Sequence, residues 1–115
     1  MHTKLEGEQK LLRIFVLEQA KWKGLPLYEA IVKEARTLGM AGATVIKGCL
    51  GFGRGAHIHS AKLLELSYDL PMLIEIVDTE EKVKTMLPRL DDMVREGLVT
   101  IEPVHVIMYR AGDIK

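Results

Sequence analysis

The sequence predicts an α+β fold, a ferredoxin-like split β-α-β-β-α-β sandwich with a four-stranded antiparallel sheet and two helices on one face. Short apolar, partly β-branched runs that suit strands alternate with two stretches whose apolar residues recur at helical spacing. The connection between the two middle strand candidates is too short for the crossover helix that parallel strands need. The length of 115 residues fits one domain, taken as residues 1–115.

The first half of the chain supplies one strand and one helix. Residues 1–9 are predicted to be a polar N-terminal extension, and residues 11–17 a mostly buried strand. Pro26 suits the first turn of a helix, and Gly39 suits its C-terminal stop. The predicted helix face consists of Leu27, Ile31, Ala35 and Leu38.

The second strand is predicted over residues 43–50, and the third over residues 70–77. The segment at residues 54–69 between them is read as a long functional loop, although its apolar cluster also allows a short helix. Asp78 and Glu81 resemble an N-terminal capping pair for the next helix.

The second helix and the last strand each contain a proline. The apolar stripe of the helix is Val83, Leu87, Leu90 and Val94. Pro88 falls inside this stripe and is expected to kink the helix. Residues 98–109 are predicted to form the fourth strand, with a bulge at Pro103 and a position at the edge of the sheet.

Composition excludes several classes of function. Lys plus Arg number 16 and Asp plus Glu number 16, which argues against a nucleic-acid binder. No apolar run approaches the ~18 residues of a membrane span, so no direct membrane insertion is expected. The polar start does not resemble a signal peptide, and the single cysteine, Cys49, cannot form an intramolecular disulfide; both favour a cytoplasmic protein. Cys49 itself is expected to be a small buried hydrophobe.

The run Gly51-Phe52-Gly53-Arg54-Gly55 is the strongest candidate for a binding site. Glycines let backbone N–H groups converge on an anion, and an arginine adds a charged fork for phosphate or carboxylate. The alternative is an ordinary glycine-rich turn with a solvated arginine. The run also fits G-x-G-x-x-A, with Glu75 near the expected acidic distance, but a dinucleotide fold needs parallel strands.

Metal binding and catalysis have weaker support. His57 and His59 flank one residue, so they could chelate a divalent metal, and a divalent-metal or anion sensor that uses this loop is the alternative function; no further ligands lie beside them in the sequence. Solvated histidines, or histidines that contact a bound phosphate, are the alternative. No nucleophile with a base and an orienting group can be identified, so an enzyme is not expected. Glu18 and Arg110, each at a strand end, are read either as surface residues or as cleft residues.

Four motifs together resemble the small PII-like proteins, a family without an assigned function that is related to the nitrogen regulatory PII proteins. They are Pro-Leu-Tyr-Glu-Ala at 26–30, Gly-Ala-Thr-Val at 42–45, Gly-Phe-Gly at 51–53 and Leu-Ser-Tyr-Asp-Leu-Pro at 66–71. The resemblance implies a homotrimeric signalling protein whose helix-free sheet faces pack together. It also implies adenine-nucleotide sites between subunits and no required cofactor.

The resemblance also assigns roles to residues. Gly42, Thr44 and Val77 would border the base. Gly51, Gly53 and Arg54 would approach phosphate, with Phe52 in the same loop, and Arg110 would reach in from the end of the chain. The 54–69 loop would report the ligand to a protein partner, such as a membrane transporter or an enzyme.

The sequence departs from the PII pattern at two cationic positions. The place of the Gly-Lys phosphate loop reads Arg95-Glu96-Gly97-Leu98-Val99-Thr100, and Met108 stands where a second arginine is usual. Both changes reduce positive charge near a triphosphate. AMP, ADP or a cyclic form is therefore expected above ATP, and regulation by nucleotidylation of a loop tyrosine is not expected.

Overall fold

The computed structural model describes residues 5–52, 59–60 and 69–112, and it confirms the split β-α-β-β-α-β fold. Its elements are β1 (Gly7–Leu17), β2 (Lys21–Trp22), β3 (Leu25–Pro26), α1 (Leu27–Thr37), β4 (Thr44–Lys47), β5 (Leu50–Gly51), β6 (His59–Ser60), β7 (Pro71–Asp78), α2 (Glu80–Met93) and β8 (Leu98–Val106). In the described part of the chain, neither helix is long and apolar enough to cross a membrane.

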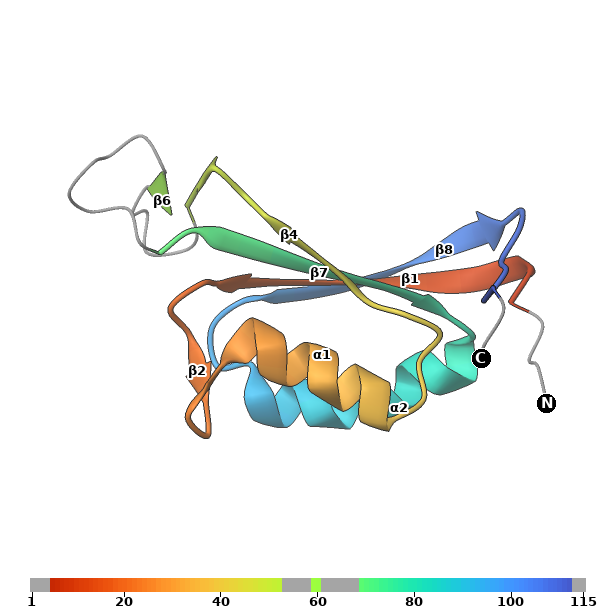
Figure 1. Ribbon diagram of the computed structural model, residues 1–115, viewed down its shortest axis with the longest axis horizontal. Helices are drawn as coiled ribbons and strands as arrows, with labels where there is room; N and C mark the ends of the chain where they lie inside the picture. The colour runs from red at the N-terminus through yellow and green to blue at the C-terminus, as the bar shows by residue number, and fades with distance from the viewer. Residues whose placement is uncertain (1–4, 53–58, 61–68, 113–115) are drawn as a thin grey trace.

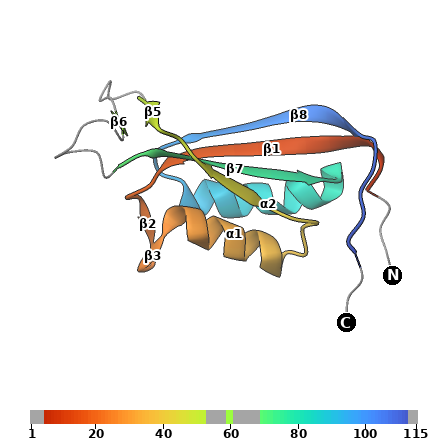
Figure 2. The same cartoon turned by 45° about the horizontal axis from the view of Figure 1, so that its top comes forward.

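The main sheet has the strand order β4-β7-β1-β8, and all its pairings are antiparallel. Both helices cover one face of it, and we call the other the open face (Figure 1). At the terminal end of the sheet, β1 and β4 begin and β7 and β8 end. At the loop end, β4 is continued by the β5–β6 pair, as Figure 2 shows.

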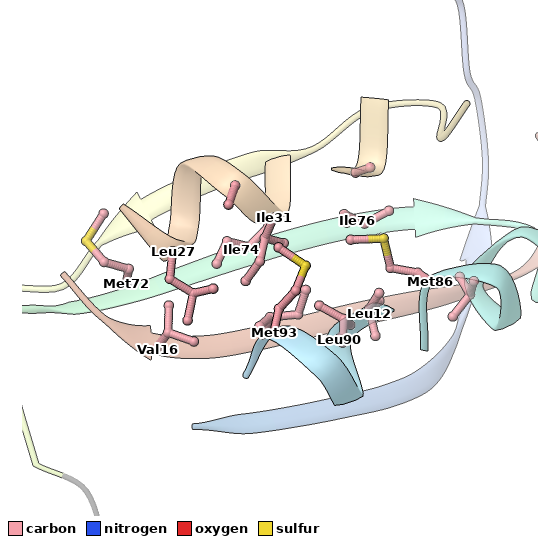
Figure 3. Close-up of a cluster of buried hydrophobic side chains, with 14 residues drawn as sticks. Leu12, Val16, Leu27, Ile31, Met72, Ile74, Ile76, Met86, Leu90 and Met93 are labelled. Carbon is pink, nitrogen blue, oxygen red and sulfur yellow. The ribbon is translucent and has the colours of Figure 1, made fainter. Parts of the chain in front are cut away.

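The core lies between the sheet and the two helices (Figure 3). Even-numbered positions of β1 and β7 point to the helices, because side chains alternate along a strand. Leu12, Ile14, Ile74 and Ile76 are among the most deeply buried of these. The helix residues that meet them are Leu27, Ala30, Ile31, Ala35, Val83, Met86, Leu90 and Met93.

The predicted stripe of the second helix is partly wrong. Val83 and Leu90 are buried as expected, but Met86 and Met93 take the inner positions, whereas Leu87 and Val94 are half-buried. Methionine adapts its unbranched side chain to irregular gaps, which suits it to these places. The helix continues through Pro88 from Glu80 to Met93 as one element.

The start of α2 also differs from the prediction. Thr79, rather than Asp78, is the N-cap, and its Oγ1 accepts the Lys82 N–H at 3.2 Å. Asp78 still belongs to β7 and is 5% exposed. Its carboxylate accepts the N–H groups of Ala41 and Thr79, each at 2.7 Å, which satisfies the buried charge.

The last strand has no bulge. β8 pairs with β1 in one continuous register from Phe15–Leu98 to Gly7–Val106, and Pro103 faces Lys10 within it. The edge position of β8 is confirmed. A proline fits an edge strand without a bulge because one side of that strand has no partner that needs its N–H.

The region before α1 contains a hairpin that the sequence reading missed. β2 and β3 pair across Lys23 and Gly24, whose φ angles are +49° and +84°. Two positive φ angles are typical of a type I′ hairpin turn. Pro26 ends this hairpin, and the helix begins one residue later.

Three smaller expectations need correction. β1 begins at Gly7, so residues 7–9 belong to the strand and not to a polar extension. The strand predicted at 43–50 is divided into β4 and β5. Cys49, between them, is exposed and not buried.

Candidate functional site

The residues assigned to the base lie at the terminal end of the sheet. Gly42 and Thr44 are exposed at the start of β4, and Val77 is the second-last residue of β7. Thr44 pairs with Glu75, and side chains two residues apart point the same way, so Thr44 and Val77 share the open face. A Cβ added at Gly42 would meet no atom within 4 Å, which leaves open space at this backbone.

Arg110 lies at the same end, in the segment that follows β8, and is exposed. A hollow of about 560 Å³ opens beside it between the end of α1, the start of α2 and this segment. Its lining includes Leu38, Ala41, Asp78, Thr79, Lys82 and Tyr109. The volume falls in the range of pockets that bind small molecules.

The residues assigned to phosphate begin at the opposite, loop end. Gly51 is in β5 and pairs with His59 of β6, and the Phe52 side chain is 71% exposed. Gly53, Arg54 and His57 lie outside the described residues, as does Tyr68. Of His59, only the backbone is described.

Packing explains part of the glycine pattern at the loop end. A Cβ at Gly48 would lie 2.8 Å from the Cγ of Pro71, and one at Gly51 would lie 3.2 Å from the same atom. The Gly48 N–H also donates to the Pro71 carbonyl at 2.7 Å. Pro71 therefore requires glycine at position 48 and favours it at position 51, independently of any ligand.

Among the described residues, the two groups lie apart within one chain. Gly51 is close to Pro71, and Val77 lies six residues further along β7. At ~3.3 Å per residue, this separates Gly51 from Val77 by about 20 Å, and from Thr44, which pairs with Glu75, by about 13 Å along the sheet. The described members of the two groups, Gly51 and Phe52 on one side and Gly42, Thr44 and Val77 on the other, therefore lie in different parts of the sheet.

The loop end has its own hollow, of about 350 Å³. Two cations that the sequence reading did not assign, Lys21 and Arg95, line it beside Asp69. The Gln19 N–H donates to Asp69 Oδ1 at 2.9 Å, which attaches the residues before β7 to the end of β1. Lys21 reaches this hollow because it lies in the β2–β3 hairpin, and no sequence motif indicates that position.

A polar row crosses the open face between its apolar parts. In the strand register Thr44, Glu75, Arg13 and Thr100 are successive neighbours across the four strands. Arg13 donates from Nε to Glu75 at 2.9 Å and from Nη1 to Glu102 at 3.0 Å. The hydrogen bond to Glu75, followed by the charge of Glu102, raises the pKa of Arg13.

Apolar side chains lie on both sides of this row. Odd-numbered positions of β1 and β7 and even-numbered positions of β4 and β8 share the open face, because paired residues point to the same side. Toward the loop end these are Phe15, Ile46, Leu73 and Leu98; toward the terminal end they are Leu11, Val77, Val104 and Val106. Glu75 is thus an outward strand residue that is paired with Arg13.

Other polar residues from the sequence reading have ordinary partners. Glu18 forms an ion pair with Lys47 at 3.0 Å beside the loop end. Within the described residues, no group of three or more His, Cys, Asp or Glu could hold a metal ion. The pair His57 and His59 remains a prediction.

The sequence of this chain matches one protein family, and its fold matches a group of solved structures. The DUF190 family, described as "Uncharacterized ACR", matches residues 9–106. A UPF0166 protein of Aquifex aeolicus (strain VF5) is 39% identical over 100 residues, which cover 87% of this chain and 94% of the relative. A UPF0166 protein of Methanocaldococcus jannaschii is 38% identical over 99 residues, covering 84% and 90%.

Among solved structures, CPII from Thiomonas intermedia K12 bound to ADP and bicarbonate matches with a TM-score of 0.66 and 21% identity, covering 86% of this chain and 88% of CPII. The same protein, described as a nitrogen regulatory PII-like protein bound to ADP, AMP and bicarbonate, matches with a TM-score of 0.63 and 20% identity over the same shares. These similarities establish a PII-like fold for this chain.

Proposed function

Since the chain belongs to the DUF190 (UPF0166) family and has the PII-like fold, we propose that it is a homotrimeric regulatory protein that binds an adenine nucleotide between its copies. The observation that best supports this is the separation of the assigned residues into two groups at opposite ends of the sheet. Each group alone is half of a site.

The exposed apolar side chains support an assembly that joins unlike ends. At the loop end, Leu50 and Phe52 are 61% and 71% exposed; at the terminal end, Ile107 and Met108 are 80% and 56% exposed. Large apolar side chains that lie together and are mostly exposed to solvent mark interaction surfaces. A contact between two unlike patches is heterologous, and it closes into a ring when the rotation permits.

Such a ring joins the loop half of one copy to the terminal half of the next. Gly42, Thr44 and Val77 would border the base, and Arg110 would approach the phosphates from the same copy. Gly51, Phe52, Gly53 and Arg54 would come from its neighbour. The nucleotides bound to CPII are consistent with this ligand class.

We expect ADP, AMP or a cyclic nucleotide to bind more tightly than ATP. The segment around Arg95 lacks the Gly-Lys phosphate loop, and Met108 takes an arginine position. Calorimetry with each nucleotide tests this expectation. ATP binding at least ten times tighter than ADP and AMP contradicts it.

The ligand is proposed to act on the segment at residues 54–69, which would report it to a protein partner. A nucleotide changes that segment only as far as it binds the two states of the protein with different affinity. The role proposed is therefore regulatory and not catalytic.

Mixing two defective variants tests whether the site is shared between copies. Arg110→Ala damages the terminal half, and Arg54→Ala damages the loop half, so neither homotrimer should bind ADP well. A co-assembled mixture contains interfaces with both halves intact, and we expect about one restored site per mixed trimer. Lys33→Ala, an exposed cation on α1, is the matched control that should bind normally. No recovery in mixed trimers means that the halves do not act together.

A further inference from the structure

Both polar groups of the Ala41 backbone are held by side chains from other elements. The Ala41 N–H donates to Oδ2 of Asp78 at 2.7 Å, and the Ala41 carbonyl accepts from the hydroxyl of Tyr109 at 3.3 Å. Asp78 ends β7, and Tyr109 follows β8. Three segments distant in sequence therefore meet at one residue.

Each contact adjoins a residue of the terminal half of the site. Ala41 precedes Gly42, Asp78 follows Val77, and Tyr109 precedes Arg110. The peptide group between Ala41 and Gly42 is planar, so the direction of the Ala41 carbonyl also sets that of the Gly42 N–H. Gly42 is the residue with open space beside it.

The two contacts differ in what they add to the fold. Asp78 is 5% exposed and also accepts the Thr79 N–H, so the fold depends on its carboxylate. Tyr109 is 39% exposed, and a hydrogen bond between neutral groups near water adds little stability. The Tyr109 contact therefore does more to orient the backbone than to stabilise the molecule.

A further side chain, from α2, holds the turn between α1 and β4. Lys82 Nζ donates to the Leu38 carbonyl at 3.2 Å, three residues before Ala41. The turn from α1 to β4 is thus fixed at two points along its length. What Tyr109 adds is a link to the segment that contains Arg110.

We propose that Asp78 and Tyr109 are positioning residues, which hold the Ala41–Gly42 peptide in the orientation that receives the nucleotide. This rests on the proposed function. Because Tyr109 and Arg110 are adjacent, the same contact couples the base-side backbone to the cation at the phosphate side. A nucleotide that engages Arg110 therefore also stabilises the Gly42 backbone.

Tyr109→Phe tests the proposal, because it removes only the hydroxyl. We expect ADP affinity to fall about three- to tenfold, the effect of one neutral hydrogen bond, with an unchanged Tm. Amide hydrogen exchange of residues 38–44 in nucleotide-free protein should become faster. Tyr28→Phe, which removes a hydroxyl from the half-buried tyrosine of α1, should change neither quantity.

Asp78→Asn is the second variant. It keeps one acceptor oxygen but loses the other, so both ADP affinity and Tm should fall. If it does not fold, Tyr109→Phe still decides the question.

The outcomes separate this proposal from the proposed function. If wild-type protein binds ADP and Tyr109→Phe binds it equally well, the positioning role is wrong and the function stands. If wild-type protein binds none of ADP, AMP, cyclic AMP and ATP, the proposed function is wrong, and the positioning role is wrong with it.

Discussion

Single residues in this chain are explained by what their neighbours leave room for. Gly97, in the turn between α2 and β8, has a backbone that passes the end of β1. A Cβ there would overlap the carbonyl oxygen of Phe15, whereas one at Gly42 would meet open space. The two glycines look alike in the sequence but have different surroundings in the fold.

Gly97→Ala should lower the free energy of unfolding by about 1–3 kcal/mol, because the backbone must move to admit the methyl group. Urea denaturation of the purified variant measures this loss. Stability equal to wild type would mean that the turn relaxes without cost.

Gly42→Ala is the matched substitution, and its expected pattern is the reverse. Stability should change by less than about 0.5 kcal/mol, since nothing in the chain is displaced. ADP affinity should fall if the space beside Gly42 belongs to the nucleotide. Unchanged affinity would remove Gly42 from the proposed site.

The elements show where local signals compete. Asp78 and Thr79 are both good N-cap types, and the sequence favoured Asp78 because of its spacing to Glu81. In the fold, the Asp78 carboxylate is occupied by the Ala41 N–H from another segment, so Thr79 becomes the cap. A long-range hydrogen bond thus decides a local boundary.

Thr79→Ala should reduce stability by about 1 kcal/mol through the loss of this cap. Thr85 is its control on the same helix, because its hydroxyl donates only to the Lys82 carbonyl, which lies within that helix. Thr85→Ala should be neutral or slightly stabilising. Thermal melts of the two variants compare them directly, and equal Tm values would argue against Thr79 as the cap.

Pro88→Ala should stabilise the protein by about 1–3 kcal/mol, because Pro88 lies inside α2 and is exposed. Alanine restores a backbone N–H within the helix and sacrifices no core packing. Chemical denaturation provides the measurement. A loss of stability would show that the proline ring contributes contacts that outweigh the missing donor.

At the scale of the whole molecule, the open face is the side of the sheet that neither helix covers in a single chain. Its polar row contains Arg13, whose guanidinium binds two carboxylates, Glu75 in the row and Glu102 beside it, and apolar side chains lie on both sides of the row. If another copy covers this face, Arg13 keeps both carboxylates paired as water leaves. Removal of one partner from a buried ionic group weakens assembly far more than removal of the whole group.

Arg13→Leu should therefore raise the dissociation constant of the assembly at least about tenfold. The triple variant Arg13→Leu, Glu75→Leu, Glu102→Leu should assemble better than the single variant, because no charge is left unpaired. Sedimentation over a dilution series measures both. Identical dissociation constants for Arg13→Leu and wild type would place the row outside the interface.

The sequence by itself determined the order of the four main strands and two helices and the approximate position of each along the chain. Periodicity is a local property, and alternation in β7 and the 3.6-residue repeat in α1 are legible without partners. The motifs at 26–30, 42–45, 51–53 and 66–71 also pointed to the correct family. The hairpin at Lys21–Pro26 escaped because two-residue strands give no periodic signal.

Only the tertiary structure decided why glycine stands at several positions, which residue caps α2 and where the assigned residues lie. Gly48, Gly51 and Gly97 are close to Pro71 and Phe15, which are distant in sequence, and the inward places of Met86 and Met93 depend on the shape of the sheet. The assigned site residues are spread along the chain from position 42 to position 110. Along β7, Val77 lies six residues beyond Pro71, the neighbour of Gly51, so these two assigned residues are about 20 Å apart, because each residue of a strand advances ~3.3 Å.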